Sequence, residues 1–215
     1  MRRIPEPELM LDAEQVRAYA DADFEAPHSH FMELLGARFD RLPQTGLALD
    51  LGCGSGDISR RYSTLFPGWR IDGIDGSATM LAAARASTPD TAPIRYMEVR
   101  LPATPTGRYD MIFSNSLLHH LADPAVLWST IRDWANSGCR VFVMDLLRPD
   151  SRASAERLVS QYAGDEPEVL QNDFLHSFFA AYEAAEIVEQ LQKADLPFSV
   201  EVVSDRHVVA WGHVD

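Results

Sequence analysis

Three closely spaced glycines follow an apolar run near residue 50, and this arrangement is suited to binding a ligand. Residues 47–51 read L-A-L-D-L, and Gly52, Gly54 and Gly56 come directly after them. The apolar run predicts a buried parallel strand, and the glycines predict a tight turn that leads into a helix. Because glycine has no side chain, such a turn brings bare backbone close to a ligand.

The spacing of the glycines differs from the patterns of two common classes of nucleotide-binding site. A dinucleotide-binding turn has the pattern G-x-G-x-x-G, and a phosphate-binding loop ends in G-K-[ST]. Here the third glycine comes one residue early, Asp57 occupies the position of the last glycine of the dinucleotide pattern, and no lysine follows. The spacing therefore argues against a phosphate cradle and against a nicotinamide-dependent oxidoreductase.

An acidic residue ends the next predicted strand. Residues 70–75 read R-I-D-G-I-D, and Asp75 lies 19 residues after Gly56. In a doubly wound α/β sheet, an acid at the end of the second strand lies beside the ribose of a bound nucleotide and accepts hydrogen bonds from its hydroxyls. The glycine turn and Asp75 together predict a site for a ribose-containing cofactor.

Two motifs identify a family. Residues 50–56, D-L-G-C-G-S-G, resemble the first motif of the class I S-adenosylmethionine-dependent methyltransferases, and residues 75–81, D-G-S-A-T-M-L, are similar to the second. The resemblance covers about residues 45–212. It implies S-adenosylmethionine as cofactor and S-adenosylhomocysteine as product. It also implies that Asp75 binds the ribose hydroxyls and that Gly76 and Met80 border the adenine.

The resemblance extends to the strands on either side of this site. Where the family has an acid that takes the adenine amino group, this chain reads Glu98-Val99-Arg100. The residues that the resemblance assigns to the cofactor are Asp50, Gly52, Cys53, Gly54, Gly56, Asp75, Gly76, Met80, Glu98, Val99, Ser114 and Asn115.

Candidate catalytic residues follow the fourth predicted strand. The stretch 109–124 resembles the fourth motif of small-molecule methyltransferases, and it places His119 and His120 near the carboxyl end of a parallel strand, where ligands bind. Histidine is suited to removing a proton from an acceptor, although it serves equally well in a structural hydrogen bond. On a helix the two side chains diverge by about 100°, so one of them would face the pocket. Tyr19, on the apolar stripe of an N-terminal helix, is a third candidate.

The surrounding chain predicts the elements that position these residues. The resemblance implies an α/β fold with a Rossmann-like, seven-stranded, mostly parallel sheet, a terminal antiparallel hairpin and helices on both faces. Residues 1–44 are expected to form a loose arm followed by a helical lid of two helices, separated at Pro27. Residues 45–215 are expected to form the methyltransferase core. Within it, 150–181 is interpreted as an insertion that builds part of the acceptor pocket, and the alternative for most of its aromatic residues is a second small core. The aromatic residues in and next to this stretch are Tyr162, Phe174, Phe178, Phe179 and Tyr182, with His176 among them.

Composition limits the partners and the compartment. The net charge of −13 over 215 residues argues against a nucleic-acid substrate, because phosphate contacts need lysine and arginine. No apolar run is long enough for a membrane span, and no secretory signal is evident. Cys53 and Cys139 fit a reduced, cytoplasmic protein. No histidines, cysteines or acids have the spacing of a metal site, so none is expected.

These features predict an enzyme that transfers a methyl group from S-adenosylmethionine to an oxygen, nitrogen or sulfur atom of a small-molecule acceptor, as a monomer or homodimer. A protein or RNA methyltransferase is the first alternative. A non-catalytic subunit that binds the cofactor is the second, because binding and turnover use different residues.

Overall fold

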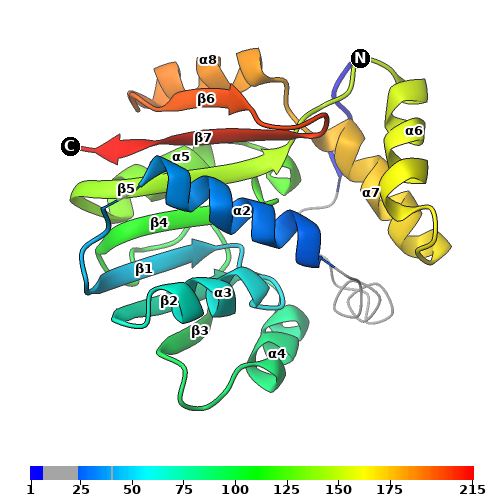
Figure 1. Ribbon diagram of the computed structural model, residues 1–215. Coiled ribbons are helices and arrows are strands. Elements are labelled where there is room, and N and C mark those ends of the chain that lie inside the picture. Colours follow the sequence, from blue (N-terminus) through cyan, green and yellow to red (C-terminus); the bar gives the residue numbers. More distant parts are fainter. Residues whose placement is uncertain (7–23, 40) are drawn as a thin grey trace.

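A seven-stranded sheet forms the centre of the computed structural model, which describes residues 1–6, 24–39 and 41–215 (Figure 1). The strands lie in the order β3-β2-β1-β4-β5-β7-β6. Their bounds are β1 Gly46–Leu51, β2 Trp69–Asp75, β3 Ile94–Glu98, β4 Tyr109–Asn115, β5 Ala135–Leu146, β6 Ser199–Val202 and β7 His207–Val214.

The direction of the strands confirms the predicted fold class. Strands β1 to β5 pair in parallel, whereas β7 is antiparallel to both β5 and β6. Only β7 therefore runs against the other strands. The carboxyl ends of β1, β2 and β4 lie at one edge, and the chain order reverses between β1 and β4, which is where ligands bind in sheets of this kind.

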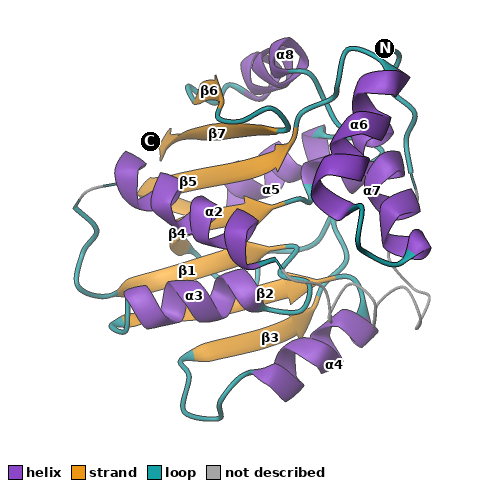
Figure 2. Cartoon of the chain, turned by 45° about the vertical axis from the view of Figure 1, so that its right-hand side comes forward, coloured by secondary structure: helices purple, strands orange, loops and turns teal. Residues whose placement is uncertain are grey.

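Helices cover both faces of the sheet (Figure 2). Helices α2 and α3 pack on one face with Phe31, Leu35 and Tyr62, and α5 and α8 pack on the other with Leu127 and Leu191. Their bounds are α2 Glu25–Arg38, α3 Asp57–Leu65, α4 Ala78–Ser87, η1 Leu118–His120 (a 3-10 helix), α5 Ala125–Trp134, α6 Arg152–Ala163, α7 Glu168–Ala180 and α8 Ala184–Ala194.

Residues 150–181 form two helices beyond the carboxyl edge of the sheet. Helices α6 and α7 pack against each other there, and the N-terminus lies beside them (Figure 1). Helix α6 begins at the cap Ser151, whose hydroxyl accepts from the backbone N–H of Ser154. The stretch that the sequence marked as an insertion is therefore a helical hairpin placed over the edge at which ligands bind.

The N-terminal region differs from the expectation in two ways. Residues 1–6 are not loose, because Ile4 N–H donates to the carbonyl of Phe179 at 2.8 Å and the Met1 amino group donates to the carbonyl of Asp150 at 3.0 Å. Pro27 does not separate two helices, because α2 already begins at Glu25 and includes Pro27 in its first turn, where proline is tolerated.

The first predicted helix, with Tyr19, lies outside the described residues. Among the residues that are described, no helix is long and apolar enough to span a membrane.

Candidate functional site

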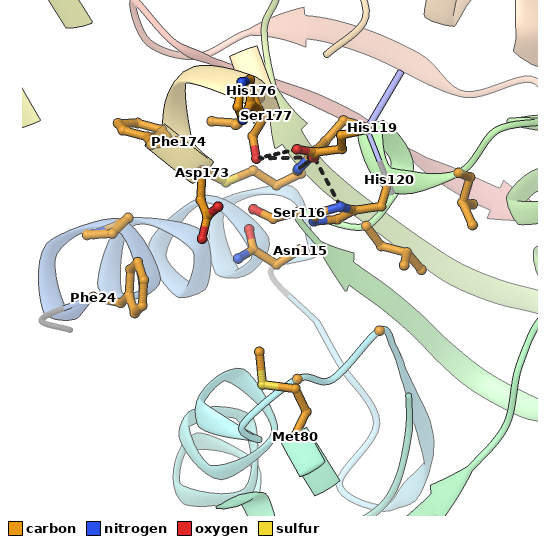
Figure 3. Close-up of a pocket in the computed structure, with 18 of the residues that line it drawn as sticks. Phe24, Met80, Asn115, Ser116, His119, His120, Asp173, Phe174, His176 and Ser177 are labelled. Atoms are coloured by element: carbon orange, nitrogen blue, oxygen red, sulfur yellow. Dashed lines mark hydrogen bonds and ion pairs between the residues drawn. The ribbon is translucent and has the colours of Figure 1, made fainter. Parts of the chain in front are cut away.

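One cavity of about 1050 Å³ lies at the carboxyl edge of the sheet. The glycine turn, Asp75 and the end of β4 form its inner wall, and the start of α2, the α6–α7 hairpin and residues 4–6 form its outer wall (Figure 3). The cavity is large enough for a nucleoside cofactor together with a second small molecule.

The glycine turn adopts the conformation that its composition demands. Gly52, Gly54 and Gly56 have φ values of 72°, 50° and 79°, a region that residues with a side chain rarely enter. A Cβ atom on Gly56 would lie 2.3 Å from the Oη of Tyr96, so this position has no room for one. Gly54 faces open space, and both Gly52 and Gly54 line the cavity.

Asp75 joins the turn to the next helix. Its Oδ2 accepts from the backbone N–H of Gly54 at 2.9 Å, and its Oδ1 accepts from that of Ser77 at 2.8 Å. Burial raises the pKa of Asp75 in spite of these bonds. An ionised carboxylate has about four acceptor sites, so Asp75 can accept from further donors. The two hydroxyls of a ribose could donate to this carboxylate, so the residues present fit a nucleoside.

Other predicted cofactor residues lie along the same wall. Gly76 and Val99 line the cavity, and so does Met80, which is 6% exposed. The N–H of Val99 donates to the carbonyl of Asp75 at 3.0 Å, which ties the end of β3 to that of β2. Glu98 is exposed and is not among the lining residues. The cavity therefore meets the chain just after β3, at Val99, Arg100 and Leu101.

Three predicted cofactor residues lie behind the wall. Asp50 accepts from the Oγ of Ser59 at 2.6 Å, and burial raises its pKa to about 7. Ser114 is fully buried, and its hydroxyl donates to the carbonyl of Leu51 at 2.8 Å. Cys53 is buried with its sulfur near Gly73, and burial raises the pKa of its thiol. These side chains hold the turn and the strand ends together.

The end of β4 supplies backbone and polar groups to the cavity. Asn115 and Ser116 line it, and Leu117 lies against Gly52. Ser116 has a φ of 57°, and its N–H donates to the carbonyl of Met144 at 2.9 Å. This sharp turn directs the chain from β4 into η1, which carries the two histidines.

His119 is held in a buried pair with Asp145 at the end of β5. The Nδ1 of His119 lies 2.5 Å from Oδ1 of Asp145, and both side chains are 3% exposed. Burial opposes both charges, but the mutual attraction raises the pKa of His119 and lowers that of Asp145. Asp145 also accepts from the backbone N–H of Leu118 at 2.7 Å, so the pair fixes the position of η1.

His120 is next to a carboxylate that the sequence reasoning missed. Its Nδ1 lies 3.0 Å from Oε1 of Glu6, and the Nε2 of His119 lies 3.4 Å from the same oxygen. The Oγ of Ser177 donates to Glu6 at 3.2 Å (Figure 3). Glu6 is 113 residues from His119 in the chain, so spacing gave no signal for it. The three side chains meet the distance condition for holding a cation, within 4.8 Å of one another, although no such site was expected.

The outer wall is largely apolar. Leu170, Phe174 and Phe179 of α7 line the cavity, as the aromatic content of 150–181 predicted, and Asp173 and His176 add polar groups. The predicted aromatic residues Phe178 and Tyr182 are buried and are not among the lining residues. This end of the cavity suits a molecule with an apolar body.

Comparisons with known proteins agree with this geometry. Residues 49–141 match the family model of the methyltransferase domain. Trans-aconitate 2-methyltransferase of Azoarcus sp. (strain BH72) is 34% identical over 87 residues, which are 40% of this chain and 33% of that protein. Malonyl-[acyl-carrier protein] O-methyltransferase of Legionella pneumophila is 30% identical over 125 residues, which are 54% of this chain and 43% of that protein. The chain thus spans less than half of the length of these two relatives.

Solved structures share the fold over nearly the whole chain. The plantazolicin methyltransferase BpumL, in complex with a monoazolic desmethylPZN analog and S-adenosylhomocysteine, superposes with a TM-score of 0.73 at 15% identity and covers 94% of this chain and 90% of its own. A SAM-dependent methyltransferase from Aquifex aeolicus superposes with a TM-score of 0.67 at 15% identity, over 96% and 100% of the two chains.

The sheet with one reversed strand and the cavity at its carboxyl edge define a Rossmann-like methyltransferase fold. Residues 49–141 match a methyltransferase domain, and the fold around them is the one that the solved methyltransferases share.

Proposed function

We propose that this protein transfers a methyl group from S-adenosylmethionine to an oxygen, nitrogen or sulfur atom of a small-molecule acceptor and releases S-adenosylhomocysteine. One observation carries the proposal. A single cavity connects the glycine turn and Asp75, which fit a nucleoside, to His120 and the apolar wall of α7, which fit a second molecule.

The cofactor end uses backbone and one carboxylate. Gly52 and Gly54 offer close approach of the main chain, Asp75 accepts from the ribose hydroxyls, and Met80 and Val99 border the base. When bound, S-adenosylmethionine supplies a methyl group that is already activated by its sulfonium. The protein therefore has little covalent chemistry to do at this end.

The work of the chain is to orient two molecules and to exclude water. Helices α6 and α7 and residues 4–6 close the outer side of the cavity. Holding two reactants in line can contribute on the order of 7–11 kcal/mol to lowering a barrier. Removing a proton from the acceptor adds a smaller factor, and His120 is placed for it because its side chain is 27% exposed, against 3% for His119.

The partner and location follow from composition and charge. A net charge of −13 favours a small molecule over RNA or DNA as acceptor. Cys53 and Cys139 are free thiols, which is consistent with the cytoplasm. A monomer or homodimer remains our expectation for the oligomeric state.

Incubation with methyl-labelled S-adenosylmethionine and a metabolite extract tests the proposal. We expect label in one or a few small molecules. Label confined to the protein or RNA fraction would favour a macromolecular acceptor. Tight binding of the cofactor without any transfer would favour a non-catalytic subunit.

A further inference from the structure

The two neighbouring histidines have different surroundings. Both ring nitrogens of His119 face carboxylates, Asp145 at 2.5 Å and Glu6 at 3.4 Å. Only the Nδ1 of His120 does so, and it lies 3.0 Å from Oε1 of Glu6 in a close contact whose angle is outside ordinary hydrogen-bond geometry. The Nε2 of His120 makes no hydrogen bond within residues 1–6, 24–39 and 41–215. The ring of His120 extends toward Asn115 and Ser116 (Figure 3). Of the two, His120 alone has a nitrogen left for a bound molecule.

Glu6 reaches this position because the N-terminal segment is anchored from several sides. The Arg3 guanidinium donates to the carbonyls of Ala180 at 2.5 Å, His119 at 3.0 Å and Leu121 at 3.2 Å, and it stacks over the ring of Tyr182 at 4.1 Å. These bonds join the segment to both η1 and α7. The segment is thus fixed next to the histidines.

Glu6 is a half-buried carboxylate. Its side chain is 11% exposed, and although burial opposes ionisation, hydrogen bonding and charge from His120, with further help from His119 and Ser177, lower the pKa of Glu6. A carboxylate beside one ring nitrogen of a histidine keeps the proton on that nitrogen and leaves the other as an acceptor.

We infer that Glu6 is a positioning residue, which holds the proton of neutral His120 on Nδ1 and aims the bare Nε2 at the acceptor, and that the acceptor's nucleophile is a hydroxyl, thiol or ring N–H. The inference rests on the proposed function and deepens it, since it names the class of acceptor. In the reaction, the acceptor's X–H proton passes to Nε2 while X bonds to the methyl carbon. The electron pair of the broken carbon–sulfur bond stays on sulfur, and His120 later releases its proton to solvent.

The charges around His120 support this class of acceptor over a carboxylate. His120 faces Glu6, and its ring centroid lies 4.1 Å from that of His119. A carboxylate nucleophile needs no base and would approach Glu6 with a charge of the same sign. A neutral X–H group avoids that repulsion, and the imidazolium formed from it lies beside Glu6, which stabilises it.

The same three side chains could instead ligate a divalent metal. Two observations favour the arrangement without a metal. The attraction of Asp145 raises the pKa of His119, and both of its ring nitrogens lie beside carboxylates, Nδ1 at 2.5 Å from Asp145 and Nε2 at 3.4 Å from Glu6. The Arg3 cation adjoins the cluster through the carbonyl of His119.

Nitrogen-15 NMR of the histidine rings, with S-adenosylhomocysteine bound, tests the positioning without any acceptor. The His120 signals are assigned by their loss in His120→Gln. We expect the Nδ1–H form to dominate for neutral His120 in the native protein and to lose its dominance in Glu6→Gln. Glu33→Gln is the matched control, because Glu33 lies 3.8 Å from Nδ1 of His30 on the surface, and it should leave His120 unchanged. An Nε2–H form in the native protein, or no change in Glu6→Gln, overturns the inference.

Two further readouts sharpen the test. Titration with Zn²⁺ should show no stoichiometric site, and one zinc per chain that is lost in Glu6→Gln overturns the inference. In turnover assays with a panel of phenols, thiols and azoles, Glu6→Gln should lower kcat about tenfold or more. The Kd of S-adenosylhomocysteine should stay within about threefold of the native value. In a His120→Gln background, Glu6→Gln should cause no further loss of kcat. Methylation only of carboxylates such as trans-aconitate, with kcat unchanged in Glu6→Gln, overturns it. Failure to bind S-adenosylhomocysteine would refute the proposed function instead.

Discussion

The substitution Asp75→Asn probes the cofactor end of the cavity. Asp75 already accepts backbone N–H bonds from Gly54 at 2.9 Å and from Ser77 at 2.8 Å, and its carboxylate has acceptor capacity left for ribose hydroxyls. In the asparagine variant, one oxygen becomes an NH₂ group that cannot accept. At least one hydrogen bond to a charged group is lost, which contributes about 1.5–3 kcal/mol. We expect the Kd of S-adenosylhomocysteine to rise roughly 10- to 150-fold.

Isothermal titration calorimetry measures this change, and Asp72→Asn is the control. Asp72 is a buried acid on the same strand, but it bonds Arg95 at 2.6 Å and Tyr109 at 2.9 Å and is not among the lining residues. Its substitution should destabilise the fold and leave the Kd of the folded protein unchanged. A Kd for Asp75→Asn within about threefold of native, less than about 1 kcal/mol, would refute the assignment of the ribose site.

Three further predictions concern stability. In urea titrations, Gly56→Ala should lower the free energy of unfolding by about 2 kcal/mol or more. Alanine is strained at a φ of 79°, and its Cβ would lie 2.3 Å from the Oη of Tyr96. A loss below about 0.5 kcal/mol would contradict this prediction. Asp145→Asn should cost about 3–5 kcal/mol, because it leaves His119 buried without its partner, and unchanged thermal unfolding would speak against the pair. Burial, with the charge of Arg206, lowers the pKa of His207 to about 4 in the folded protein, against about 6.5 in the unfolded chain. As the pH falls from about 6.5 to 4, His207 is therefore protonated in the unfolded chain but remains neutral in the folded protein. Stability should therefore decrease over that range by up to about 3 kcal/mol, and His207→Gln should remove that component; an identical pH profile for both proteins would count against it.

The fold could be predicted because its signals are local. The apolar run before Gly52, the helix cap at Ser77 and the alternating residues of 199–214 each depend on neighbours in the chain, and the structure has a turn, a helix and a hairpin there. The helix α7 was harder to predict. Phe174, Phe178 and neighbouring apolar residues occupy more than one of its faces, because one side packs on α6 while another lines the cavity, and this weakens the helical period.

The site could be predicted in part, for a related reason. Asp75 and Asn115 follow strand ends, so their place at the cavity depends on topology that the motifs indicate. Glu6 reaches His120 only through the anchoring of the N-terminal segment on α7, a contact between distant parts of the chain that no local pattern encodes. Ser114 is one residue from Asn115, yet its hydroxyl bonds the carbonyl of Leu51, because successive side chains of a strand lie on opposite faces of the sheet.

Titration of the native protein with S-adenosylhomocysteine and, separately, with NAD is the most direct test of the central claim. The geometry of the glycine turn and Asp75 predicts binding of S-adenosylhomocysteine at one site per chain, with a Kd on the order of 1–100 µM, and no binding of NAD. Absence of heat with S-adenosylhomocysteine at millimolar concentration, or binding of NAD in its place, would contradict the account.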